Sequence, residues 1–148
     1  MTEKLLDKNI VNQVREVFEQ LDQPVEVLYF GRKTDCEYCD DTLQLAEEVV
    51  AISNKLSLKK YDIDEDVELA HEYNVDKVPG LVFAGRDGEQ VVDYGVRMAG
   101  IPSGHEFSSL IHDLVLVSSR DSGLSQDTRK SLKEIQEPVL LQVFITPT

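Results

Sequence analysis

The spacing of apolar side chains divides the chain into helices and strands of ordinary length. Apolar residues three or four positions apart predict an amphipathic helix near the N-terminus, which ends before Pro24. Its stripe comprises Ile10, Val11, Val14, Val17, Phe18 and Leu21. Residues 25–30 are β-rich and apolar on both faces toward their end, which is typical of a central strand covered on both sides.

Helices and strands continue to alternate after a short polar loop. The pattern predicts a helix opening at Cys36, strand 58–63, helix 66–73, strands 81–84 and 91–94, and a helix from Ser103. Asp87 and Gly88 supply the positive φ angles of a tight turn between the last two strands. A strand–helix–strand unit requires a parallel pair, and a hairpin adds an antiparallel one. This order therefore predicts an α/β fold with a mixed four-stranded sheet and helices on both faces.

Composition narrows the class of protein. The chain has 148 residues, 41% of them hydrophobic and 29% charged, which suits one globular domain without disulfide staples. Its net charge of −13 repels phosphate backbones and anionic lipid, so we expect no nucleic-acid partner and no membrane surface. No apolar stretch is long enough to span a bilayer. The charged N-terminal residues lack the apolar core of a signal peptide, and we expect a cytoplasmic protein.

The two cysteines, Cys36 and Cys39, lie three positions apart at a strand-to-helix junction. A thiol at a helix N-terminus faces unpaired N–H groups and the positive end of the helix dipole, which stabilise its thiolate. Three residues are about one helical turn, so the second sulfur can close a small disulfide ring. We interpret Cys36 as the nucleophile and Cys39 as the thiol that resolves the mixed disulfide. Two alternatives stay open: a metal held across a dimer interface, and a pair of inert cysteines.

The charges around this pair oppose one another. Four carboxylates flank Cys36, and they disfavour its thiolate: Asp35, Glu37, Asp40 and Asp41. Arg32 and Lys33, together with the helix dipole, favour it. The sign of the net effect stays open at this point. If the carboxylates dominate, the pair is a better reductant than oxidant.

Two motifs resemble the thioredoxin/glutaredoxin-fold family. They are Cys-Glu-Tyr-Cys at residues 36–39, after a buried strand, and Tyr-Asn-Val-Asp-Lys-Val-Pro at residues 73–79, before the third strand. The resemblance implies that Pro79 is cis and packs against the active-site sulfurs. It also implies that Val78 offers backbone groups to an extended substrate segment and that Tyr38 shapes the substrate groove. Residues 100–107 are similar to a segment of the two-unit, glutaredoxin-like protein disulfide oxidoreductases of prokaryotes.

A short internal repeat extends this resemblance. Residues 138–144 (Pro-Val-Leu-Leu-Gln-Val-Phe) echo residues 24–30 (Pro-Val-Glu-Val-Leu-Tyr-Phe), and an amphipathic segment precedes each. We therefore expect a thioredoxin-like redox unit at 1–118, a linker at 119–124, and at 125–148 the first helix and strand of a truncated second unit. A lone apolar strand at 139–145 would expose both edges, so it should dock on its own sheet or, in a dimer, on a neighbour's.

The sequence thus predicts a thiol–disulfide oxidoreductase that acts on protein disulfides by dithiol exchange, without metal or organic cofactor. Its partners would be protein disulfide substrates and an electron-donating reductase. The alternative is a docking or electron-relay module of a larger reductase, because similar units occur at the N-terminus of flavin-dependent peroxiredoxin reductases. There the first unit resembles one that has lost its cysteines, and the intact pair here favours the oxidoreductase.

Overall fold

A computed structural model describes residues 3–146, so the outermost residues of the predicted ranges 1–118 and 125–148 lie outside the described part. The elements in chain order are α1 (Lys8–Phe18), β1 (Val25–Gly31), α2 (Cys39–Val50), β2 (Leu56–Asp62), α3 (Val67–Glu72), β3 (Gly80–Asp87), β4 (Gln90–Ala99), α4 (His105–Ser119) and α5 (Gln126–Lys133). As far as α5 they alternate as the apolar pattern predicts. Strand β4 is longer than the predicted 91–94, because its pairing with β3 resumes beyond a register shift at Phe83/Ala84.

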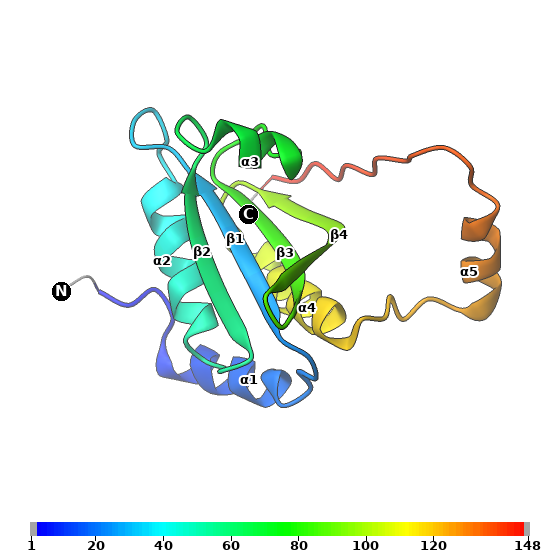
Figure 1. Cartoon of the computed structure of the whole chain (residues 1–148). Coiled ribbons are helices and arrows are strands. Elements are labelled where there is room, and N and C mark those ends of the chain that lie inside the picture. The colour runs from blue at the N-terminus through cyan, green and yellow to red at the C-terminus, as the bar shows by residue number, and fades with distance from the viewer. Residues whose placement is uncertain (1–2, 147–148) are drawn as a thin grey trace.

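The four strands form one mixed sheet in the order β2-β1-β3-β4 (Figure 1). Strands β1 and β2 are parallel, and both β1–β3 and β3–β4 are antiparallel. The mixed four-stranded sheet predicted from the order of elements is therefore confirmed. Because β1 is central and buried along its whole length, the chain that leaves its end is held in a defined position.

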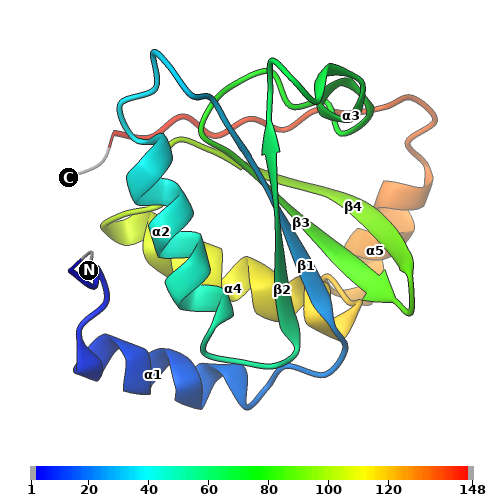
Figure 2. The ribbon, with the colours of Figure 1, turned by 60° about the vertical axis from the view of Figure 1, so that its left-hand side comes forward.

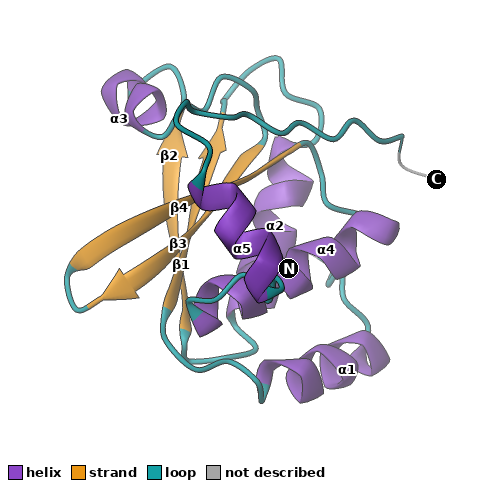
Figure 3. Ribbon diagram, turned by 90° about the vertical axis from the view of Figure 1, so that its right-hand side faces the viewer, coloured by secondary structure: helices purple, strands orange, loops and turns teal. Residues whose placement is uncertain are grey.

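Helices cover the two faces of the sheet unequally, as Figure 3 shows: α1, α2 and α4 pack on one face and α3 lies on the other. Alternate residues of β1 point to the two sides. Val25, Val27 and Tyr29 join the larger core with the three helices. Leu28 and Phe30 join a smaller cluster under α3. The expectation of helices on both faces is confirmed.

A buried carboxylate interrupts the apolar pattern of β1. Glu26 is fully buried, and its carboxylate oxygens contact Lys59 Nζ at 2.9 Å and the guanidinium of Arg86. The two cations come from the flanking strands β2 and β3, and each keeps part of its side chain in solvent. Burial of a carboxylate requires such partners, because an unpaired buried charge is strongly destabilising.

The C-terminal part differs from the prediction. Helix α5 forms, with the Ser125 hydroxyl accepting from Thr128 N–H at 3.2 Å, and it lies apart from the sheet (Figure 1). The predicted docking of residues 139–145 on the chain's own sheet is wrong: in the described part, residues 138–146 are extended but pair with no strand. They run past the end of the sheet that carries α3 (Figure 2). A strand requires a partner edge, and neither β2 nor β4 receives this segment. The division into two units stays a prediction.

Candidate active site

The two cysteines lie where the chain passes from β1 into α2. Cys36 and Cys39 form a disulfide with their Cα atoms 5.5 Å apart. Helix α2 begins at Cys39 and not at Cys36 as predicted, because Asp35 has a positive φ of 54° and residues 37–38 form a turn. The turn brings the sulfurs together as effectively as a helical turn would. Cys36 therefore lies just outside the helix, in the loop that follows β1.

The two sulfur-bearing residues differ in their access to solvent. Cys39 is buried, with 2% of its surface exposed, whereas Cys36 is partly exposed. Tyr38 between them is 48% exposed. An incoming reactant can therefore reach Cys36 more readily than Cys39. This asymmetry agrees with the different roles that the sequence predicts for the two thiols.

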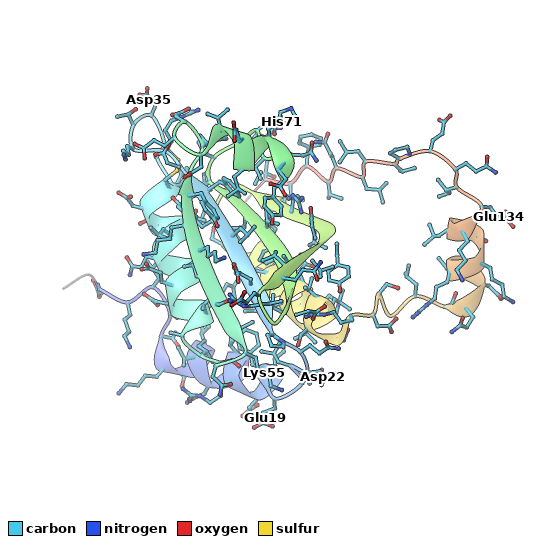
Figure 4. The ribbon with its side chains drawn as sticks, in the orientation of Figure 1. Glu19, Asp22, Asp35, Lys55, His71 and Glu134 are labelled. Atoms are coloured by element: carbon cyan, nitrogen blue, oxygen red, sulfur yellow. A yellow bond between two sulfur atoms is a disulfide. The ribbon has the colours of Figure 1, made fainter. Side chains whose placement is uncertain are left out.

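The nearby cations are engaged by carboxylates of the β2–α3 loop. Arg32 donates to Asp64 at 2.7 Å and 3.2 Å, and Lys33 pairs with Glu65. The hydrogen bond from Arg32 lowers the pKa of Asp64. Asp35 points outward from the tip of the β1–α2 loop, at the same end of the sheet as His71 on α3 (Figure 4). Since both cations are already paired, the carboxylates around Cys36 are the less compensated charges.

Sequence reasoning missed one residue beneath the disulfide. The hydroxyl of Tyr29 on β1 donates a buried hydrogen bond of 2.9 Å to the main-chain carbonyl of Cys39. Burial raises the pKa of Tyr29, as do Asp40 and Asp62. The only sequence signal was a tyrosine two positions before Gly31, the last residue of the strand.

The Val78–Pro79 segment lies at the same end of the sheet. Its peptide bond is cis, as the resemblance implied. Strand β3 starts at Gly80, which pairs with Phe30 next to the end of β1, so residues 78–79 lie at the edge from which the β1–α2 loop departs. Pro79 is buried, and its carbonyl accepts from Gly100 N–H at 2.8 Å. Val78 is half-buried, and within residues 3–146 its backbone makes no hydrogen bond.

Other candidate ligands are dispersed. His71 is exposed on α3, and His105 and His112 are exposed on α4, seven positions apart. In the described part of the chain, no three His, Cys, Asp or Glu side chains are grouped as metal ligands would be. No helix between residues 3 and 146 has the length and apolar character needed to cross a membrane.

The sheet order, the disulfide at the strand-to-helix junction and the cis proline before β3 together define a thioredoxin-like redox domain. Residues 23–112 match the sequence model of the Thioredoxin domain family, and the chain belongs to that family.

Relatives with curated names are longer proteins. An alkyl hydroperoxide reductase of Pseudomonas aeruginosa is 29% identical over 132 residues, which cover 89% of this chain and 22% of that protein. An NADH dehydrogenase of Bacillus subtilis is 28% identical over 144 residues, 97% of this chain and 25% of that protein. The chain thus spans about a quarter of the length of these relatives.

Solved structures agree with this placement. A protein disulfide oxidoreductase from Aeropyrum pernix K1 superposes with a TM-score of 0.74 at 30% identity, covering 88% of this chain and 56% of that one. The NTD_N/C domain of an alkylhydroperoxide reductase from Enterococcus faecalis gives 0.75 at 24% identity, with 86% and 59% covered, and shows the shared fold. The chain is therefore a thioredoxin-like homologue of a protein disulfide oxidoreductase, and it carries the Cys-x-x-Cys pair.

Proposed function

We propose that this chain is a thiol–disulfide oxidoreductase that acts on protein disulfides through Cys36 and Cys39. The observation that carries the proposal is the asymmetric disulfide, in which a partly exposed Cys36 is bonded to a buried Cys39 at the end of the central strand. A thiol pair with one accessible and one sheltered member can accept a substrate at one sulfur and release it with the other.

The reaction proceeds in two exchanges. In the reduced protein, the Cys36 thiolate attacks one sulfur of a substrate disulfide, forms a mixed disulfide, and expels the other substrate sulfur as a thiolate that takes up a proton. The Cys39 thiolate then attacks the Cys36 sulfur, forms the Cys36–Cys39 bond, and expels the second substrate thiolate, which is also protonated. Two electrons pass from the chain to the substrate.

Substrate recognition is assigned to the surface beside Cys36. The free N–H and C=O of Val78 can pair with an extended substrate segment, in the manner of an added strand. The exposed ring of Tyr38 and the buried ring of Pro79 are the side chains proposed to flank that segment. Backbone pairing gives affinity with little dependence on sequence, which suits an enzyme with several protein substrates.

We further infer that the pair is a reductant. Arg32 and Lys33 are bound to Asp64 and Glu65, so little positive charge is left to stabilise a thiolate at Cys36. A less stabilised reduced form gives its electrons more readily. The chain then requires an electron-donating reductase as its partner, no metal or organic cofactor, and a reducing compartment such as the cytoplasm.

An insulin-reduction assay tests the proposed activity. The reduced chain should accelerate the precipitation of insulin by dithiothreitol, and Cys36→Ser should bring the rate back to that of dithiothreitol alone. A wild-type chain that gives no acceleration would contradict the proposal.

The length of the relatives supports a second candidate function, an electron-relay module within a longer reductase. The chain matches only 22% of the alkyl hydroperoxide reductase and 25% of the NADH dehydrogenase. As a relay, the pair would exchange electrons with one cognate reductase and one acceptor, and insulin would be a poor substrate. Rapid reduction of the disulfide by a flavoprotein reductase, without insulin reduction, would favour this candidate.

The C-terminal segment is proposed to mediate self-association through strand pairing between copies. Most of its apolar side chains are largely exposed, including Leu141 at 87%, Val143 at 85% and Phe144 at 83%. Such a segment tends to pair with a free sheet edge, and a neighbouring chain offers one. The partner edge in this proposal is β2 or β4 of a second copy.

Removal of residues 125–148 should therefore convert a dimer to a monomer in sedimentation velocity, with insulin reduction unchanged. Leu141→Glu with Phe144→Glu in the full chain should act in the same direction, because two charges disfavour burial of the segment. An unfolded truncated chain would instead place the segment in the core of the first unit, and a monomeric full chain would contradict self-association.

A further inference from the structure

The start of helix α2 lacks the usual side-chain cap. Its N-cap residue, Tyr38, makes no side-chain hydrogen bond to the first turn. Thr42 in that turn is fully buried, and its hydroxyl has no partner within residues 3–146. Among the described residues, the hydrogen bond from Tyr29 to the Cys39 carbonyl is the one side-chain hydrogen bond made to residues 36–42. The first turn, which carries Cys39, is thus tied to the central strand through Tyr29.

We propose that Tyr29 is a positioning residue for disulfide closure, which acts by holding the backbone of Cys39 so that its sulfur faces Cys36. The proposal rests on the dithiol-exchange function proposed above. Tyr29 is only 6% exposed and lies on β1, which has a strand on each side, so its hydroxyl is a fixed anchor. The carbonyl that it binds belongs to the same residue as the resolving sulfur.

Gly31 makes this contact possible. A Cβ atom at residue 31 would lie 2.2 Å from the Tyr29 hydroxyl oxygen and 2.6 Å from Cζ, far inside contact distance. The Tyr29 ring therefore extends along β1 directly over Gly31 toward the first turn of α2. Any side chain at residue 31 would push the hydroxyl away from the Cys39 carbonyl. The pair of residues Tyr29 and Gly31 forms the physical connection between the strand and the resolving cysteine.

The protonation state of Tyr29 supports this role. Burial, Asp40 and Asp62 raise the pKa of the phenol above its ordinary value of 10.0. A phenol with a raised pKa stays protonated, and remains a hydrogen-bond donor, throughout the pH range in which thiols titrate. Tyr29 therefore keeps the proton that it donates to the Cys39 carbonyl while the thiols titrate.

Loss of the Tyr29 contact should change the closure of the Cys36–Cys39 disulfide. It should change the first attack, by Cys36 on an external disulfide, very little. In the mixed disulfide, Cys39 must attack the Cys36 sulfur, and the rate of this intramolecular step depends on how well the two sulfurs are held in line. The first attack by Cys36 on an external disulfide does not depend on Cys39. A positioning residue should thus affect the second exchange selectively, whereas a merely structural one would affect neither.

Reaction of the reduced chain with one equivalent of 5,5′-dithiobis(2-nitrobenzoate) separates the two steps in a stopped-flow experiment. Attack by Cys36 releases one coloured thiolate, and closure by Cys39 releases the second. We expect Tyr29→Phe to leave the first phase unchanged and to slow the second about fivefold, as loss of a hydrogen bond of ordinary net strength implies. The closing equilibrium in glutathione buffers should fall by the same factor, which makes the reduction potential about 20 mV less negative.

Two further variants test the connection. Gly31→Ala should slow the second phase in the same direction, because its Cβ atom would displace the Tyr29 ring that carries the hydroxyl. Tyr61→Phe is the matched control: Tyr61 lies on the neighbouring strand β2, and its hydroxyl makes no hydrogen bond among the described residues. It should leave both phases at the wild-type rate.

A folded Tyr29→Phe chain with a wild-type second phase and a wild-type closing equilibrium would overturn the proposal. So would an equal effect of Tyr61→Phe. These measurements use the chain and a small disulfide alone. If Tyr29→Phe alters closure but the wild-type chain does not reduce insulin, the positioning role stands and the proposed function on protein disulfides fails.

Discussion

Replacement of Cys39 by serine is expected to turn the chain into a trap for its substrates. Cys36 can still attack a protein disulfide, but no neighbouring thiol is left to release the product. The mixed disulfide should persist more than about a hundredfold longer, because a tethered and oriented thiol acts at an effective concentration that free thiols do not reach. Non-reducing electrophoresis and mass spectrometry of the adducts would measure this.

The Cys36→Ser variant is the matched control, since it keeps a single thiol in the same motif. It should form no adducts, because Cys39 is buried at 2% exposure. Equal amounts of trapped product in the two variants would contradict the assignment of the nucleophile. Absence of adducts in both would count against dithiol exchange altogether.

Truncation of Phe83 to alanine should have the largest effect on stability. Phe83 is fully buried on β3, where it contributes to the core shared with α1, α2 and α4. Loss of such a ring removes apolar burial and leaves a cavity, so the free energy of unfolding should fall by about 3–5 kcal/mol. Guanidinium denaturation followed by far-UV circular dichroism would determine it.

Phe144→Ala offers the same chemical change at a residue that is 83% exposed. It should alter the unfolding free energy by less than about 0.5 kcal/mol. A large loss of stability in this variant would mean that the C-terminal segment packs on the domain in solution. That result would also contradict the proposed role of the segment in pairing with another copy.

The fold was predictable because its signals are local. The helical stripes, the Asp87–Gly88 turn and the apolar strand before the motif each act over a few residues, and the short connections leave little choice of topology. The Cys-x-x-Cys pair could be located in the same way. The start of α2 was predicted three residues too early, because the positive φ of Asp35 has no clear sequence signal.

The features that could not be predicted depend on contacts that the sequence does not specify. The contact between Tyr29 and Cys39 requires knowledge of how the ring lies along the strand over Gly31. The extended segment at 139–145 has the composition of a central strand, yet composition does not supply a partner. In residues 3–146 no edge pairs with it, so the prediction that it docks on the chain's own sheet was wrong.

The buried Glu26 has a consequence for how the strands align. Lys59 and Arg86 reach it only because β2 and β3 place them on the same face of the sheet as its carboxylate. A slip of either strand by one residue would turn its cation toward the helices α1, α2 and α4, leaving unpaired charge buried on both faces. The buried ion pairs of Glu26 with Lys59 and Arg86 therefore disfavour sheets in which the strands are misaligned. Correct alignment of the strands also matters for the Cys-x-x-Cys motif, because the pairing of β1 with β3 sets Val78 and Pro79 beside the loop that carries Cys36.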